Sequence, residues 1–202
     1  MLNDLDNLLI LLASFKNKHK FNPFDNYHYR DLLVYKNISK IDGSYLPNTN
    51  SRGGYDFHNS RTDKGECKTS KIYKSSIAKY QNQYLTNACC LEFDKQTDKK
   101  RQIETLEYGA FSFGLIDAQT EKIVFTLYLN NETAVNEFRQ IIINKQNKFD
   151  EFCESNKFIH KRVYRDAIRF SVRDIININS IVIQDENAAV INKDDFLNRV
   201  VC

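Results

Sequence analysis

Three charged residues, Asp56, Glu66 and Lys68, have the types and the spacing of a metal-dependent phosphodiesterase site. Glu66 and Lys68 lie two positions apart in a stretch that reads as a β-strand, so their side chains point to one face and that of Cys67 points to the other. A hairpin would bring Asp56 alongside Glu66. The sequence therefore predicts two carboxylates and one ammonium on the same face of a sheet.

Carboxylates in this arrangement are suitable ligands for Mg²⁺, which prefers a few hard oxygen atoms together with waters and a substrate phosphate. We expect Asp56 and Glu66 to hold the metal, and Mn²⁺ to be accepted in place of Mg²⁺. A metal bound there polarises a phosphodiester and lowers the pKa of a bound water. Lys68 would orient that water or help to deprotonate it, and would stabilise the negative charge that develops.

The elements expected to position these residues are the two strands of a hairpin. Tyr55–His58 and Glu66–Tyr73 read as strands, and the polar run Ser60–Gly65 between them reads as a turn. Before the hairpin, Asn37–Gly54 is rich in Asn, Ser, Gly and Pro and is expected to be a long loop. Because this loop leads directly into Asp56, its polar residues are well placed to contact bases.

The rest of the chain combines patterns typical of helices and strands, which indicates a single α/β domain over residues 1–202, with a mixed central β-sheet flanked by α-helices. Leucines at three- and four-residue steps predict the first helix, and alternating phenylalanines predict a buried strand. We expect the core to cover about residues 4–130 and residues 131–202 to form a helical C-terminal part. The expected helices are 4–17, 75–91, 131–155 and 160–176, the expected strands are 108–116, 123–129 and 182–183, and residues 30–36 fit either. Asn131 is expected to cap the helix 131–155. The apolar stripe of that helix is expected to consist of Val135, Phe138, Ile142, Phe149 and Phe152.

The motif D-x9-E-x-K on a predicted hairpin, with a helix before it and a helix and further strands after it, resembles the PD-(D/E)xK nuclease superfamily. The run GECKTS at the second strand is typical of that group, which includes the type II restriction endonucleases. Tyr55 stands where the proline of the motif would precede Asp56. The resemblance implies a restriction endonuclease-like core in which Asp56, Glu66 and Lys68 are the catalytic residues of a Mg²⁺-dependent endonuclease. Cleavage of both strands of double-stranded DNA implies in turn a homodimer.

Contacts to DNA have to come from clusters of cations, because 29 Lys and Arg against 26 Asp and Glu leave a net charge of only +3. Four arginines at steps of three, four and four residues predict one stripe on the expected helix 160–176. Arginine suits both phosphates and guanine edges. A second cluster of cations surrounds the hairpin. The expected DNA-contacting residues are Arg52, Arg61, Lys71, Arg162, Arg165, Arg169 and Arg173.

Several other ionisable residues lie near the motif or in the first helices. Asp4, Asp6 and Asp31 are candidates for an additional metal ligand, although helix capping or a plain surface position accounts for them as well. His58 shares a face with Asp56, but we expect it to be a structural histidine. The five cysteines are odd in number and lack CxxC spacing, and no apolar run is long enough to span a membrane. We therefore expect reduced thiols in a cytoplasmic protein.

Three functional interpretations stay open on the sequence alone. The first is a sequence-specific type II restriction endonuclease. The second is another nuclease of the same fold, such as a DNA repair or mobile-element enzyme. The third is a non-catalytic nucleic-acid-binding or assembly module, in which the charges of the hairpin are incidental. An unrelated small-molecule enzyme has little support, because the sequence contains no phosphate loop, no GxSxG and no dinucleotide fingerprint.

Overall fold

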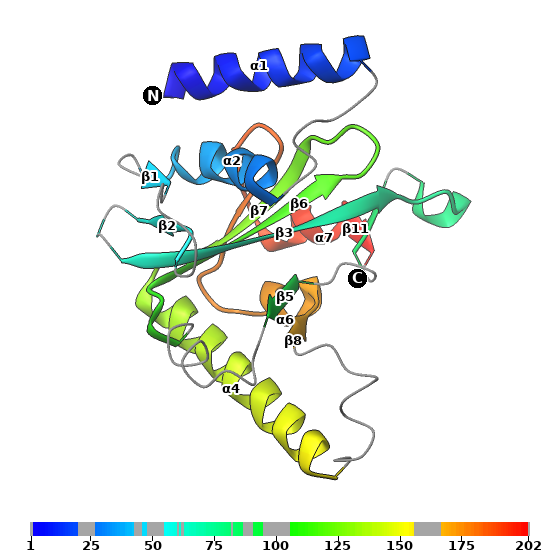
Figure 1. Cartoon of the computed structure of the whole chain (residues 1–202). Helices are drawn as coiled ribbons and strands as arrows, with labels where there is room; N and C mark the ends of the chain where they lie inside the picture. The colour runs from blue at the N-terminus through cyan, green and yellow to red at the C-terminus, as the bar shows by residue number, and fades with distance from the viewer. Residues whose placement is uncertain are drawn as a thin grey trace.

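A mixed β-sheet crosses the middle of the protein and separates the helices into two groups (Figure 1). The computed structural model describes residues 2–19, 27–42, 46–47, 55–59, 61, 63–81, 83–86, 91–94, 106–155 and 167–201. Within these residues the main sheet has the order β1-β2-β3-β6-β7-β9-β10, with β4 paired to β3 and β11 paired to β4. The strands are Leu46–Pro47 (β1), Phe57–His58 (β2), Lys64–Lys74 (β3), Tyr84–Leu85 (β4), Ala110–Asp117 (β6), Ile123–Leu129 (β7), Val182–Gln184 (β9), Val190–Ile191 (β10) and Val200–Val201 (β11).

The centre of the sheet is formed by β6 and β7, in which every residue is buried. This confirms the two central strands that the sequence predicted. β6 pairs in parallel with β3 over eight residues, from Gly65↔Ala110 to Ile72↔Asp117, and antiparallel with β7. The α/β class with a mixed sheet is therefore as expected. The sheet does not end with β7, because β9 pairs antiparallel with that strand.

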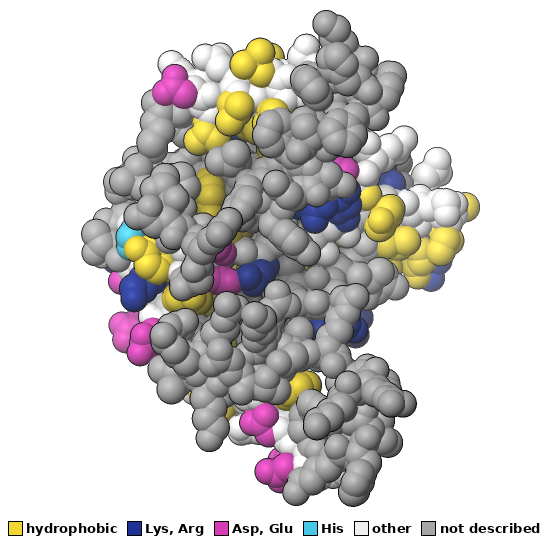
Figure 2. All heavy atoms as spheres, in the orientation of Figure 1, with side chains coloured by type: hydrophobic (Ala, Val, Ile, Leu, Met, Phe, Trp, Pro, Cys, Tyr) yellow, Lys and Arg dark blue, Asp and Glu magenta, His cyan; other side chains and the backbone are white. Residues whose placement is uncertain are grey.

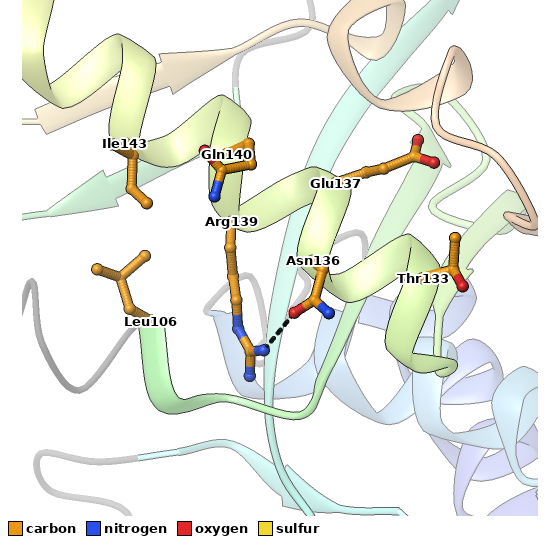
Figure 3. A pocket seen from close by; sticks show the side chains of 7 residues that line it. All are labelled: Leu106, Thr133, Asn136, Glu137, Arg139, Gln140 and Ile143. Carbon is orange, nitrogen blue, oxygen red and sulfur yellow. Dashed lines mark hydrogen bonds between the residues drawn. The ribbon is translucent and has the colours of Figure 1, made fainter.

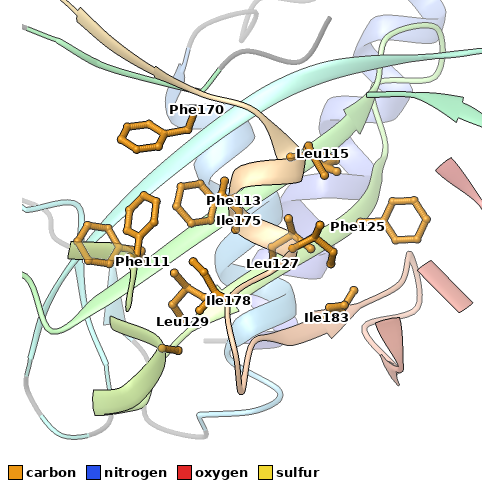
Figure 4. Packing of buried hydrophobic residues seen from close by; sticks show 14 of the residues in the cluster. Phe111, Phe113, Leu115, Phe125, Leu127, Leu129, Phe170, Ile175, Ile178 and Ile183 are labelled. Carbon is orange, nitrogen blue, oxygen red and sulfur yellow. The ribbon is translucent and has the colours of Figure 1, made fainter. Parts of the chain in front are cut away.

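On one face of the sheet, a core of aromatic and aliphatic side chains lies under α4 (Glu132–Ser155), α6 (Val172–Ile176) and α7 (Lys193–Leu197). A separate two-stranded pair, β5 (Leu91–Asp94) and β8 (Ala167–Phe170), lies on the same side. Figure 4 shows how side chains from β6 and β7 meet those of β8, α6 and β9. Phe138 of α4 is at the centre of this core, because its ring contacts those of Phe111, Phe113 and Phe170.

On the other face, α2 (Tyr27–Ile38) packs on the sheet, and α1 (Leu2–His19) lies outermost, over α2 (Figure 1). Leu33, Val34 and Ile38 of α2 are buried against this face. Residues 30–36, which fitted either a helix or a strand, are therefore helical. α1 confirms the expected helix over 4–17. Its Leu12 is buried, and its Asp6 forms an ion pair with Lys36 of α2.

The predicted cap of the long helix is also confirmed. The side-chain oxygen of Asn131 accepts a hydrogen bond from the backbone N–H of Ala134 at 2.9 Å. An N-cap residue satisfies one of the backbone donors that have no partner inside the helix. α4 then continues to Ser155. Of the predicted apolar stripe, Val135, Phe138 and Ile142 are buried, whereas Phe149 and Phe152 are half-buried.

The helix predicted over residues 75–91 is wrong. The described part of this segment contains a single 3₁₀ turn at Ala78–Tyr80, the strand β4 and the first residue of β5. Ser75 N–H donates to the carbonyl of Gln83 at 2.8 Å and closes a loop. β4 then takes its backbone partners from β3 and β11. The helical spacing of the apolar residues did not decide the conformation, because pairing with β3 and β11 satisfied the backbone groups instead.

The helix predicted over residues 160–176 is also wrong. Ala167–Phe170 is the strand β8, and Ser171 starts the separate short helix α6 through a capping box with Asp174. Arg169 and Arg173 therefore lie on different elements and not on one helical stripe. Arg162 and Arg165 lie outside the described residues. The C-terminal part is not wholly helical, because it supplies β8, β9, β10 and β11.

Two smaller differences concern the segments around the hairpin. The first hairpin strand is shorter than Tyr55–His58 and covers Phe57–His58, and the second begins at Lys64, within the expected turn. The expected loop over 37–54 begins later, because α2 continues to Ile38. Within it, Leu46–Pro47 pairs with His58 and Phe57. Among the described residues, no helix is long and apolar enough to cross a membrane.

Replacing the central aromatic residue of the larger core tests this packing. We expect Phe138→Ala to lower the free energy of unfolding by about 3–5 kcal/mol, because a fully buried ring is lost and a cavity remains. Phe138→Leu should cost clearly less, because it fills most of the space. Urea denaturation followed by circular dichroism measures both. Equal and small losses for the two variants would show that Phe138 does not organise this core.

Candidate active site

Asp56 is held in place by backbone pairing and by its own side chain. Its N–H donates to the carbonyl of Gly65 at 2.8 Å, and its Oδ2 accepts the N–H of Cys67 at 2.8 Å. Its carbonyl accepts the hydroxyl of Tyr35 from α2 at 3.1 Å. The predicted hairpin is therefore present, with β2 and β3 antiparallel. It places the Asp56 carboxylate against β3 at the position between Glu66 and Lys68.

Close packing beneath the hairpin explains why a glycine, Gly65, precedes Glu66. The ring of Phe57 is fully buried and lies over Gly65, so that a Cβ atom added at Gly65 would collide with it. Phe57 also contacts the rings of Tyr35 and Tyr128. This packing fixes β2 against β3 and thereby fixes Asp56, the residue immediately before Phe57.

The alternation of β3 separates the charged pair from the neighbouring cysteine as predicted. Cys67 is a buried free thiol that packs with the residues of α2. Glu66 and Lys68 pair in register with Phe111 and Phe113 of β6 and share the face that carries α4. The Lys68 ammonium forms an ion pair with the Glu66 carboxylate. Glu66 is nearly buried, with 9% of its surface exposed.

The electrostatics of the site are those of one cation between two carboxylates. Burial alone would lower the pKa of the Lys68 ammonium, but the charges of Glu66 and then Asp56 outweigh it and raise that pKa above its ordinary value of 10.5. Lys68 is therefore a cation at neutral pH. In this state it stabilises negative charge and does not accept a proton. Both carboxylates act on the same ammonium, so they lie near one point.

The donor chemistry of this point suits a divalent cation. Asp56 and Glu66 offer carboxylate oxygens, and Mg²⁺ is commonly bound by one or two carboxylates together with waters and substrate phosphates. A metal ion there would compete with Lys68 for Glu66. Within the described part of the chain, no group of three or more His, Cys, Asp and Glu side chains could hold a metal. The two carboxylates would therefore be the protein's ionisable ligands among these residues.

The other candidate ligands are not brought to this point. Asp6 is paired with Lys36, and α1 lies on the opposite side of the sheet from Glu66 and Lys68. The side chain of Asp31 lies outside the described residues. The His58 ring stacks on the ring of Tyr55, with centroids 4.5 Å apart. That contact agrees with the structural histidine expected from the sequence.

Two of the cations expected to contact DNA are engaged within the protein. Arg61 donates to the carboxylate of Asp63 and to the carbonyl of Asn130 and ties the hairpin turn to the end of β7. Lys71 forms an ion pair with Glu121 at 2.7 Å. By the alternation of β3, Lys71 also lies on the face opposite Lys68. Arg52 lies outside the described residues.

Arg169 and Arg173 remain on the same side of the sheet as Glu66 and Lys68, although they do not form a helical stripe. Both side chains are exposed. Their neighbours Phe170 and Val172 are buried in the core under α4. In β8, Arg169 stands opposite Glu92 of β5. The two arginines are thus anchored by the residues between them and directed to the surface.

A shallow pocket of about 530 Å³ lies beside the first half of α4 and contains none of the predicted site residues (Figure 3). Arg139 in its wall donates to Asn136 and to the carbonyl of Tyr108. Glu137 accepts two hydrogen bonds of 2.8 Å from Asn179. These polar groups serve to join α4 to its neighbouring segments.

The sequence did not indicate the part played by Tyr35. Its hydroxyl binds the backbone of Asp56, and its ring contacts Phe57. The segment 30–36 could be read as a helix or as a strand, and only the helix directs Tyr35 to the hairpin. Assigning this segment as a helix with Leu33, Val34 and Ile38 on its buried side would have indicated that Tyr35 also faces the sheet.

The raised pKa of Lys68 gives a testable pH dependence in metal-free protein. A raised folded pKa contributes stability that is fully present below about pH 10.5, and that stability is lost as the pH rises through the folded pKa. We expect Glu66→Gln to lower the pKa of Lys68, measured from its Cε resonance in the presence of a chelator. Glu121→Gln, which removes the partner of Lys71 on the opposite face, should leave it unchanged. An unchanged pKa of Lys68 in Glu66→Gln would refute this electrostatic description.

Comparisons with known proteins do not assign the chain to a family. No protein-family model matches the sequence, and no curated protein matches it either. Any proposal for the function therefore has to rest on the geometry of the hairpin and not on a relative.

Proposed function

We propose that this chain is a Mg²⁺-dependent endonuclease that hydrolyses phosphodiester bonds of double-stranded DNA, and that it is a sequence-specific type II restriction enzyme with a restriction endonuclease-like core. The observation that carries the proposal is the convergence of Asp56 and Glu66 on Lys68, achieved by the pairing of β2 with β3. Two carboxylates and one cation held together by a paired hairpin are the parts that metal-assisted phosphodiester hydrolysis requires.

The residues have distinct roles in the proposed reaction. Mg²⁺, when bound by Asp56 and Glu66, would polarise the phosphodiester and lower the pKa of a bound water. The water oxygen forms a bond to phosphorus and releases its proton to solvent water, the bond from phosphorus to one sugar oxygen breaks, and the leaving oxygen takes a proton from solvent water. Lys68, being a cation, stabilises the charge that builds up on the phosphate oxygens. Asp56 is positioned by the N–H of Cys67 and by Tyr35.

DNA would approach on the side of the sheet that carries Glu66 and Lys68. Arg169 and Arg173 are exposed on this side. The strand and turn after the motif add positive charge through Lys74 and Lys79, and residues 69–90 contain no Asp or Glu. Figure 1 shows the end of β3 and the following turn projecting from the body of the protein. A homodimer in the cytoplasm completes the proposal, because two strands have to be cut.

A second candidate is a non-catalytic nucleic-acid-binding or assembly module. The Glu66–Lys68 ion pair favours it, because the two charges satisfy each other without a metal. The candidate predicts that binding of DNA persists and that no cleavage occurs with any divalent cation. A DNA repair or mobile-element nuclease of the same fold would instead cut without a fixed recognition sequence.

Incubation with a large mixed-sequence duplex, with and without Mg²⁺, tests the proposal on a gel. We expect discrete fragments that require Mg²⁺ or Mn²⁺. Lys68→Ala should lower the cleavage rate by on the order of 100- to 1,000-fold, because a charge-stabilising group is removed. Lys148→Ala, which removes an exposed lysine in the second half of α4, is the matched control and should cut normally.

The outcomes of this assay separate the candidates. A smear that requires Mg²⁺ would support a nuclease and overturn its sequence specificity. DNA that stays intact with folded wild-type protein across several metals and salt concentrations would overturn the enzymatic proposal. Retained binding in that case would favour the binding module.

The contribution of the exposed arginines is measured by the salt dependence of DNA binding. We expect Arg173→Ala to reduce the slope of log K against log salt by about 0.9 for the phosphate contact it loses. The loss should be similar for unrelated duplex sequences, because phosphate contacts carry no sequence information. Lys40→Ala, at the end of α2 on the opposite side of the sheet, should leave the slope unchanged. Fluorescence anisotropy in Ca²⁺ or chelator gives the values, and an equal slope for wild type and Arg173→Ala would exclude this contact.

A further inference from the structure

Residues 73–81 and 83–85 form an arm that projects from the body of the protein (Figure 1). Its two sides are the end of β3 and the strand β4, which pair antiparallel, and its tip contains the 3₁₀ turn Ala78–Tyr80. Tyr73 and Ile77 are 59% and 54% exposed, so the side chains of the arm extend into solvent although two of them are large and apolar. An ordered projection of this kind is a candidate interaction surface.

The arm carries positive charge and no negative charge of its own. Residues 69–90 contain no Asp or Glu, and the side chains of Lys74 and Lys79 are exposed. The Lys74 ammonium lies 5.7 Å from the ring centroid of Tyr84, and that of Lys79 lies 5.4 Å from the ring centroid of Tyr80. Such a contact orients an ammonium and leaves its charge in place. Figure 2 shows basic and hydrophobic side chains together on the projection at the right of the molecule.

Lys74 lies on the same face of β3 as the charged residues of the candidate site. Positions 68 and 74 are an even number of residues apart, and side chains at such positions of a strand share a face. Ile72, which lies between them on that face, is buried in the core under α4 and confirms the alternation. At about 3.3 Å per residue, Lys74 lies ~20 Å along the strand from Lys68. This length corresponds to about six base pairs of duplex DNA.

The size and the charge of the arm fit a long polyanion better than a folded protein. Stable interfaces between proteins commonly use about 20–30 residues a side, and the tip of the arm is much smaller. Phosphates of a duplex are single charges at regular spacing, so one lysine is sufficient for each contact. Because Lys68 and Lys74 lie on one continuous strand, a duplex placed at the first can extend to the second.

We propose that the arm is a second DNA contact, in which Lys74 and Lys79 bind backbone phosphates of duplex DNA at a distance of roughly six base pairs from the phosphate at Lys68. The inference rests on the proposed function, because it takes double-stranded DNA as the substrate. It adds to that function a contact that lies outside the cleavage site and requires no metal. Because phosphates are alike in every sequence, this contact contributes affinity and no sequence information.

Fluorescence anisotropy of a labelled duplex, measured with chelator over a range of salt concentrations, tests the arm. We expect Lys74→Ala and Lys79→Ala each to reduce the slope of log K against log salt by about 0.9, and the double variant to reduce it by about 1.8, because each lysine neutralises one phosphate. Lys74→Arg/Lys79→Arg should keep the wild-type slope, because both charges are retained. Circular dichroism should show unchanged folding, because the replaced side chains are exposed.

Two control variants separate the charge of the arm from its shape and from charge elsewhere. Ile77→Ser changes an exposed side chain of the arm without changing its charge, and Lys40→Ala removes a lysine at the end of α2 on the opposite side of the sheet. Both should keep the wild-type slope. A loss of slope in either control equal to that in Lys74→Ala would overturn the assignment to the lysine charges of the arm.

The same protein samples, tested for DNA cleavage with Mg²⁺ and Mn²⁺, distinguish failure of the arm from failure of the proposed function. Wild-type protein that cuts DNA, together with a wild-type slope in Lys74→Ala/Lys79→Ala, overturns the arm and leaves the nuclease standing. DNA that is never cut, together with the reduced slope in that variant, supports the arm and overturns the nuclease. Folded wild-type protein that does not bind duplex DNA at low salt overturns the arm.

Discussion

The parallel pairing of β3 with β6 is the constraint on which the arrangement of this protein depends. It runs over eight residues and joins a strand from the first half of the chain to the fully buried centre of the sheet. A strand in such a register has no freedom to rotate, because a shift by one residue would turn every side chain to the other face. Cys67 is therefore directed to α2, and Glu66 and Lys68 are directed to the side of α4.

The same constraint brings charged groups into a partly buried position at the candidate site. Two carboxylates and an ammonium are placed at the edge of an aromatic core, where burial disfavours every charge. The protein resolves this by pairing them, since Glu66 binds Lys68 and Asp56 accepts the N–H of Cys67. A site with this balance is suited to exchange one cation for another. That exchange, of an ammonium for a divalent metal ion, links the fold to the proposed hydrolysis.

The sequence predicted those elements whose signals are local. The hairpin, the two central strands and the capped helix α4 follow from alternation, turn residues and an N-cap, and all are present. It failed where a distant partner decides the conformation. Within the expected helix 75–91, Tyr84–Leu85 forms β4 and pairs with β3 and β11. Residues 167–170 pair with β5 and interrupt the expected arginine helix. The sequence predicted that Glu66 and Lys68 share one face of the sheet, because alternation along a strand is a local signal. The hydrogen bond from the Tyr35 hydroxyl to the carbonyl of Asp56 could not be predicted, because it depends on how α2 packs on the sheet.

Direct measurement of divalent metal binding tests the central claim, that Asp56 and Glu66 together form a cation site beside Lys68. Calorimetric titration with Mn²⁺ in the presence of non-cleaved duplex DNA should show one saturable site per chain in the wild type. Glu66→Gln and Asp56→Asn should each abolish it, and Glu121→Gln, which alters the other Lys–Glu pair of β3, should retain it. A wild type that binds no metal, or binding that survives the loss of both carboxylates, would contradict the account.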